Sequence, residues 1–124
     1  MRSKNKYLLC SFKNSFTGFY YCLRTQRNFR IHLVIAILVL GFACFLKIEK
    51  IEILILFFTI ILVLILEIIN TAVETLIDLV VPDWTEKARI VKDVAAAAVL
   101  AAAIGSVIVG VIIFSPYISL ITNH

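Results

Sequence analysis

The sequence predicts an all-α membrane protein in which an N-terminal amphipathic surface helix precedes three transmembrane helices. Hydrophobic residues make up 62% of the 124 residues, whereas a soluble domain is typically about 45–50% apolar. A chain of this length is expected to form a single domain over residues 1–124. Since so small a domain cannot bury this much apolar surface, we expect lipid to surround it.

Three apolar segments are long enough, or nearly so, to cross the ~30 Å hydrocarbon core of a bilayer. We expect transmembrane helices at about residues 29–47, 51–80 and 86–117. The first is the shortest, and a snorkelling Arg30 can extend it toward the interface. The second reaches roughly 45 Å at about 1.5 Å per residue, so its last turns must leave the hydrocarbon core.

Local signals mark the junction between the second and third membrane helices. The run Val81-Pro82-Asp83 is expected to end the second helix, because the residue before a proline disfavours helical geometry. Thr85 is of a residue type that caps helix N-termini, so it is expected to begin the third helix.

Residues 6–28 have the spacing of an amphipathic helix that lies on a membrane surface. The apolar side chains within roughly 80° of each other are Leu8, Phe12, Phe16, Phe19 and Leu23. The polar side chains on the opposite side are Lys6, Lys13, Thr17 and Arg24. The alternative is a helix that packs on a soluble partner.

Most of the basic residues lie in two parts of the sequence. Seven of the twelve lysine and arginine residues lie at or before Arg30, and three more lie between the second and third apolar segments. The positive-inside rule therefore places the N-terminus and the second loop in the cytoplasm and the C-terminus outside. Because this distribution follows membrane topology, no nucleic-acid partner is expected.

A polar stripe follows the uncharged run 53–66 on one face of the second membrane helix. Its members, which fall within roughly 80° at about 100° per residue, are Glu67, Asn70, Glu74 and Asp78. Ionisable groups at membrane depth are costly, so they indicate a functional site.

The stripe has the chemistry to bind a metal and accept a proton. Mg²⁺ prefers oxygen ligands and is often held by one or two carboxylates together with substrate phosphates. A further carboxylate can act as general base toward a hydroxyl, and Arg89 and Lys92 can neutralise phosphate oxygens. The set suits phosphoryl transfer, although an ion pathway or a purely structural polar network would use similar residues.

Other common motifs are missing from the sequence. Gly105 and Gly110 have the spacing of the two P-loop glycines, but Val111 stands in place of the lysine. The three cysteines have no CxxC spacing, and therefore predict neither a zinc site nor a disulfide framework.

Two stretches resemble the signature of the prokaryotic diacylglycerol kinase family, which includes undecaprenol kinases. They are Glu67-Ile-Ile-Asn-Thr-Ala-Val-Glu-Thr-Leu-Ile-Asp78 and Ala88-Arg-Ile-Val-Lys-Asp-Val-Ala-Ala-Ala-Ala-Val99. Arg27-Asn-Phe-Arg-Ile-His32 also resembles the start of the family's first membrane helix, so the resemblance covers nearly the whole chain. It implies a homotrimer in the bacterial cell membrane, with active sites shared between subunits near the cytoplasmic surface.

The resemblance further implies an enzyme that transfers the γ-phosphate of Mg-ATP to the hydroxyl of diacylglycerol or undecaprenol. By the same resemblance, Glu67 is the catalytic base, Asn70 orients substrate or the γ-phosphate, and Glu74 binds Mg²⁺. The residues implied to contact or position the nucleotide are Asp78, Lys92 and Asp93. For Arg89, a phosphate contact and anchoring at the cytoplasmic surface are equally open.

One position departs from the family pattern. Members often have a glutamate three residues before the position of Phe29 as a second metal ligand, and this chain has Gln26 there. An amide oxygen can still bind Mg²⁺ but lacks the charge, so a catalytically weakened relative is one alternative. The others are a non-enzymatic membrane subunit and a proton-coupled transporter. His32 is interpreted as an interfacial side chain that reaches lipid headgroups rather than as a catalytic one.

Overall fold

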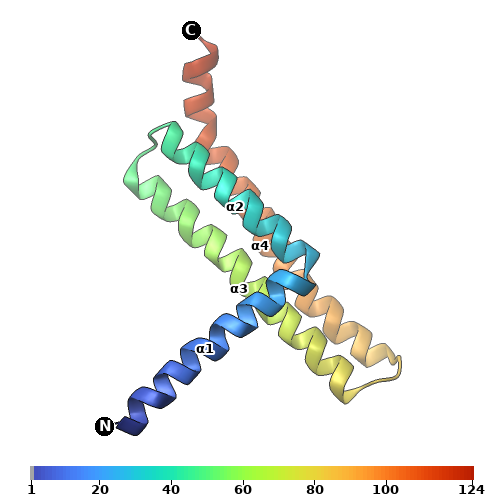
Figure 1. The fold of residues 1–124 in the computed structure, drawn as a ribbon. Helices are drawn as coiled ribbons and strands as arrows, with labels where there is room; N and C mark the ends of the chain where they lie inside the picture. The colour runs from blue at the N-terminus through green and yellow to red at the C-terminus, as the bar shows by residue number, and fades with distance from the viewer. Residues whose placement is uncertain (1) are drawn as a thin grey trace.

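The computed structural model describes residues 2–124 as four helices (Figure 1). They are α1 (Arg2–Thr25), α2 (Arg27–Phe45), α3 (Lys50–Val80) and α4 (Glu86–Thr122). The last three form an elongated bundle, and α1 leaves the start of α2 at a steep angle to it (Figure 1). This confirms the all-α class and the three long apolar helices.

Helix α3 is the central element of the bundle. It packs against α4 over most of its length and against α2 over a shorter stretch, while α1 touches α2 and α3. The backbones of α2 and α4 do not approach each other closely. They meet through side chains near the α2–α3 turn, where the rings of Phe42 and Phe114 lie 5.4 Å apart.

Helices α2, α3 and α4 are each long and apolar enough to cross a membrane. Only 11–17% of the residues in their most apolar windows are buried within the chain. The apolar side chains therefore point outward on nearly all sides, which is the arrangement of a multi-pass membrane protein whose solvent is lipid.

A small apolar core lies at the end of the bundle that carries the α2–α3 turn. Its buried members are Ala43, Ile48, Leu56 and Ile113. The turn itself passes through Lys47, whose φ of 52° is in the left-handed region. Next to it, the hydroxyl of Tyr117 donates to Glu52 at 2.6 Å and accepts from the backbone N–H of Glu49 at 3.4 Å.

The corner between α1 and α2 is held by side chains of the first turn of α2. Phe29 is fully buried, and its ring meets that of Phe19 edge-on with centroids 5.2 Å apart. The guanidinium of Arg30 donates to the backbone carbonyls of Leu23 and Arg24 at 3.1 and 2.9 Å. These carbonyls at the end of α1 have no partner within their own helix, so Arg30 caps α1 and fixes the start of α2.

The largest differences from the expected helix boundaries lie at three places. Helix α1 begins at Arg2 rather than residue 6. The corner falls at Gln26, with extended φ and ψ of −104° and 108°, rather than after residue 28, because Arg30 caps α1 there. Helix α4 passes through Pro116 to Thr122 instead of stopping near residue 117. A proline removes one backbone hydrogen bond and crowds the turn before it, which membrane helices tolerate because other groups satisfy the freed carbonyl.

The junction between α3 and α4 follows the sequence signals. Helix α3 ends at Val80, directly before Val81 and Pro82. The side-chain oxygen of Thr85 accepts a hydrogen bond from the backbone N–H of Ala88 at 3.1 Å, so Thr85 is the N-cap of α4.

Candidate active site

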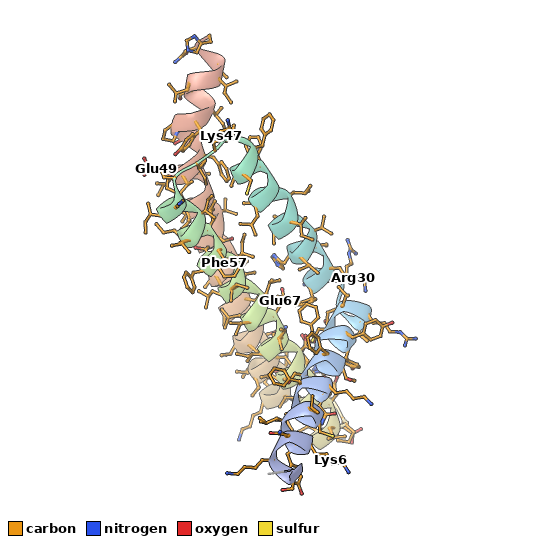
Figure 2. The ribbon with its side chains drawn as sticks, turned by 60° about the vertical axis from the view of Figure 1, so that its left-hand side comes forward. Lys6, Arg30, Lys47, Glu49, Phe57 and Glu67 are labelled. Carbon is orange, nitrogen blue, oxygen red and sulfur yellow. The ribbon has the colours of Figure 1, made fainter. Side chains whose placement is uncertain are left out.

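The polar stripe lies where α3 extends beyond the start of α2. Helix α3 has 31 residues and α2 has 19, so they are about 46 and 28 Å long. Because the two helices share the turn at one end, the last turns of α3 have no α2 beside them and run along the first turns of α4 (Figure 1). The stripe begins with Glu67 near the start of α2 (Figure 2) and continues toward the α3–α4 loop.

Glu67 is the buried end of the stripe. The residue is 4% exposed, and its Oε1 lies 3.3 Å from Nε2 of His32 on α2. One turn later, the buried Thr71 donates its hydroxyl to the backbone carbonyl of Glu67 at 2.9 Å. A carboxylate in a membrane helix is expensive unless it has a polar partner, and His32 is that partner.

Asn70 and Glu74 form the middle of the stripe. Nδ2 of Asn70 donates to Oε1 of Glu74 at 3.3 Å, one helical turn apart. Oδ1 of Asn70 is buried and has no hydrogen-bond partner among the residues that the structure describes. Buried polar atoms are almost always paired, so a buried acceptor beside a carboxylate indicates a place for a cation or a hydrogen-bond donor. This donor set of an amide and a carboxylate oxygen fits Mg²⁺.

Two ion-pair groups form the exposed end of the stripe. The ammonium of Lys92 on α4 contacts the carboxylate of Asp78 on α3. Within α4, Arg89 pairs with Glu86 and, at 2.7 Å, with Asp93. Lys92 is the least exposed of these side chains, at 37%, and the other four are about half-exposed or more, so they lie where a water-soluble anion can reach them.

Gln26 lies at the corner between α1 and α2 and is half-buried. No hydrogen bond joins its side chain to Glu74 among the contacts of residues 3–124. Over the same residues, no group of three or more His, Cys, Asp or Glu side chains is gathered as a metal site. One chain therefore brings together the pair Asn70–Glu74 but not the full ligand set expected from the sequence.

The contact of His32 with Glu67 is the feature that sequence reasoning missed. Buried residues of α2 at helical spacing are Phe29, Ala36 and Ala43, and His32 falls within about 60° of them. This spacing of an aromatic and small residues marks the face of α2 that can approach another helix closely. Recognising that face in the sequence would have placed His32 against α3 instead of among lipid headgroups.

An apolar groove of about 600 Å³ lies between α2, α3 and α4. His32 lines the groove near the start of α2, and Phe42 and Phe114 line it toward the α2–α3 turn. The hydroxyls of Thr59 and Ser106 in its wall donate to backbone carbonyls of their own helices. The groove therefore has a mostly apolar wall, and at the start of α2 it has a polar edge, the imidazole that contacts Glu67.

Residues 13–114 match the family model described as prokaryotic diacylglycerol kinase. This match covers well over half of the chain and includes α2, α3 and most of α4. The chain belongs to the prokaryotic diacylglycerol kinase family. Every expected site residue, from Gln26 to Asp93, lies within the matched range, as does His32.

Two curated relatives in the prokaryotic diacylglycerol kinase family are named as kinases. A diacylglycerol kinase of Synechocystis is 46% identical over 115 residues, which is 91% of this chain. An undecaprenol kinase of Bacillus subtilis is 37% identical over 106 residues, which is 86% of both chains. The aligned region is 66% of the Synechocystis protein, so this chain spans about two thirds of that relative's length.

Proposed function

We propose that this chain is an ATP-dependent membrane lipid kinase. It transfers the γ-phosphate of Mg-ATP to the hydroxyl of diacylglycerol or undecaprenol, and the products are phosphatidic acid or undecaprenyl phosphate. The observation that supports this best is the course of the polar stripe. It starts at a carboxylate buried against α2 and leads along one helix face to exposed ion pairs, so a lipid hydroxyl and a soluble nucleotide can meet along it.

In this proposal the carboxylate of Glu67 removes the proton from the lipid hydroxyl. The hydroxyl oxygen then forms a bond to the γ-phosphorus, the bond from that phosphorus to the β–γ bridging oxygen breaks, and ADP leaves. The burial of Glu67 suits this role, because a base that meets a lipid must lie at the depth of the lipid's polar end. The groove beside His32 offers space for the apolar chain of the lipid.

The unpartnered Oδ1 of Asn70 and the carboxylate of Glu74 are the groups that would hold Mg²⁺. When bound, the metal neutralises charge on the phosphate oxygens. Asn70 also orients the substrate or the γ-phosphate, and Gln26 is the proposed second metal ligand. Since Mg²⁺ usually keeps several ligands from water and phosphate, two protein oxygens are a sufficient start for the site.

The nucleotide is proposed to bind at the exposed end of the stripe. The residues assigned to it are Asp78, Arg89, Lys92 and Asp93, which lie together on the ends of α3 and α4. Their cations already pair with acids of the same chain, so bound phosphate would compete for or share these partners.

The proposed setting is a homotrimer in the bacterial plasma membrane. The N-terminus and the site face the cytoplasm, as the distribution of basic residues favours. Helix α1 lies along the membrane surface, since its apolar side chains Phe12 and Phe16 are 65% and 73% exposed and have no core to enter. The incomplete metal ligand set among residues 3–124 favours sites completed by a neighbouring subunit.

The deciding experiment is phosphate transfer by the purified protein in bilayers. Radiolabelled ATP is supplied with diacylglycerol or with undecaprenol, with Mg²⁺ or with a chelator, and the lipids are separated by thin-layer chromatography. We expect Mg²⁺-dependent label in at least one lipid product and its loss in Glu67→Gln. No label in either lipid would refute the proposal and favour a non-enzymatic subunit, a transporter or an inactive relative.

A further inference from the structure

The contact between His32 and Glu67 joins two helices at the buried end of the polar stripe. Nε2 of His32 on α2 lies 3.3 Å from Oε1 of Glu67 on α3, and the two side chains are 27% and 5% exposed. We infer that His32 is a positioning residue that holds the Glu67 carboxylate for proton abstraction from the lipid hydroxyl. This inference rests on the proposed function, in which Glu67 is the base.

His32 is itself held in place by its neighbours on α2. One turn before it, Phe29 is fully buried against Phe19, and one turn after it, Ala36 is 6% exposed. Arg30 caps the end of α1 with two hydrogen bonds. The first two turns of α2 are therefore anchored on both sides of His32, so its ring is presented to α3 from a fixed backbone.

Glu67 has a carboxylate on a side chain with three rotatable bonds and needs such a partner. Among residues 3–124, the contact with His32 is the one polar side-chain contact of this carboxylate. Nε2 can carry the proton of a neutral imidazole, so the contact places a potential donor 3.3 Å from Oε1, and Oε2 has no partner in the same part of the chain. The contact thus holds one oxygen and leaves the other to accept the substrate proton.

The position of His32 also connects the carboxylate with the apolar groove. The imidazole lines the groove of about 600 Å³ and also contacts Glu67. A lipid whose chain lies in the groove therefore brings its polar end to the edge where His32 and Glu67 meet. Losing the contact would let the carboxylate rotate away from that point, and misplacement by about 1 Å can cost roughly 100-fold in rate.

Two substitutions separate positioning from a merely structural role. His32→Leu removes the donor, whereas His32→Gln keeps an N–H donor on a side chain of similar reach. We expect His32→Leu to lower kcat roughly 10- to 100-fold with little change in KM for ATP, and His32→Gln to keep most of the wild-type kcat. Asn28→Leu, a polar-to-leucine change at an exposed site one turn earlier in α2, is the matched control and should retain wild-type turnover.

Equal losses of kcat in His32→Leu and His32→Gln, or unchanged kcat in both, would overturn the inference. A second readout does not depend on activity. The chain has two histidines, so the side-chain ¹⁵N resonances of His32 can be followed against those of His124 in protein without a tag. We expect Glu67→Gln to shift the His32 resonances and leave those of His124 in place.

The two readouts distinguish failure of the inference from failure of the proposed function. If wild-type protein phosphorylates a lipid but Glu67→Gln does not shift the His32 resonances, the positioning role is wrong and the kinase assignment stands. If wild-type protein phosphorylates neither lipid, both the proposed function and the positioning role are refuted, even if the spectra show the contact between His32 and Glu67.

Discussion

The ammonium group of Lys92 on α4 contacts the carboxylate of Asp78 on α3 at the end of the bundle opposite the α2–α3 turn. The pair spans two helices, whereas the neighbouring pair of Arg89 and Asp93 lies within α4. Lys92 and Asp78 therefore tie the two helices together at the place where we propose that the nucleotide binds.

Exchanging the two charges of that pair separates ligand binding from helix pairing. The double variant Asp78→Lys with Lys92→Asp can re-form an ion pair, which contributes only about 0–1 kcal/mol because Asp78 is exposed and Lys92 is partly exposed. We expect near wild-type stability but a KM for ATP raised at least about 10-fold, as a lost charged phosphate contact costs more than 1.4 kcal/mol. Recovery of wild-type KM in the exchange variant would leave the pair with a structural role alone.

Glu74→Gln is expected to abolish nearly all Mg²⁺-dependent phosphate transfer while the protein stays folded. The amide keeps the shape of the side chain but removes the charge that neutralises a divalent cation. Turnover is measured over a range of Mg²⁺ concentrations. Glu52→Gln is the matched control, because it makes the same change on α3 at the opposite end, beside Tyr117. Equal turnover of the Glu74 variant and this control would remove Glu74 from the metal site.

Glu67→Gln is expected to lower kcat by about 10²- to 10⁴-fold, the usual contribution of a general base. Nucleotide affinity should change much less, because Glu67 acts on the lipid hydroxyl and lies in the buried part of the stripe. Steady-state kinetics with ATP varied at saturating lipid distinguish the two effects. An unchanged kcat would exclude Glu67 as the base.

Gln26→Glu is expected to raise the rate or to strengthen its dependence on Mg²⁺, because a carboxylate binds this cation better than an amide does. Gln26 lies at the α1–α2 corner and is half-buried. Asn28→Asp adds a negative charge two residues away at an exposed site and is the control for a non-specific charge effect. If both variants behave like the wild type, Gln26 lies outside the metal's ligand shell.

Phe29→Ala tests the α1–α2 corner. Phe29 is fully buried and packs edge-on against Phe19. We expect a loss of about 2–3 kcal/mol in the free energy of unfolding in mixed micelles, less than the 3–5 kcal/mol of a water-soluble core because lipid is itself apolar. Phe45→Ala, at a ring that is 78% exposed, should change it little. Similar losses in the two variants would mean that the corner is not held by Phe29.

Much of the fold follows from local patterns. The length and apolar character of α2, α3 and α4 are visible in the sequence, as are the end of α3 before Pro82 and the cap of α4 at Thr85. The corner at Gln26 was placed too late along the chain, because it depends on the guanidinium of Arg30 reaching back to α1. The two hydrogen bonds of Arg30 join residues seven and six positions apart and cross a helix boundary, so helical periodicity does not predict them.

The sequence by itself determined the helices, the composition that requires lipid around them, and the alignment of Glu67, Asn70, Glu74 and Asp78 on one face of α3. The tertiary structure decided the partners of those residues: His32 against Glu67, Lys92 against Asp78, and no partner within the described chain for Oδ1 of Asn70. The physical reason is that periodicity assigns a side chain to a face of its own helix. Which faces meet depends on where a short α2 begins beside a long α3, and on how the helices pack.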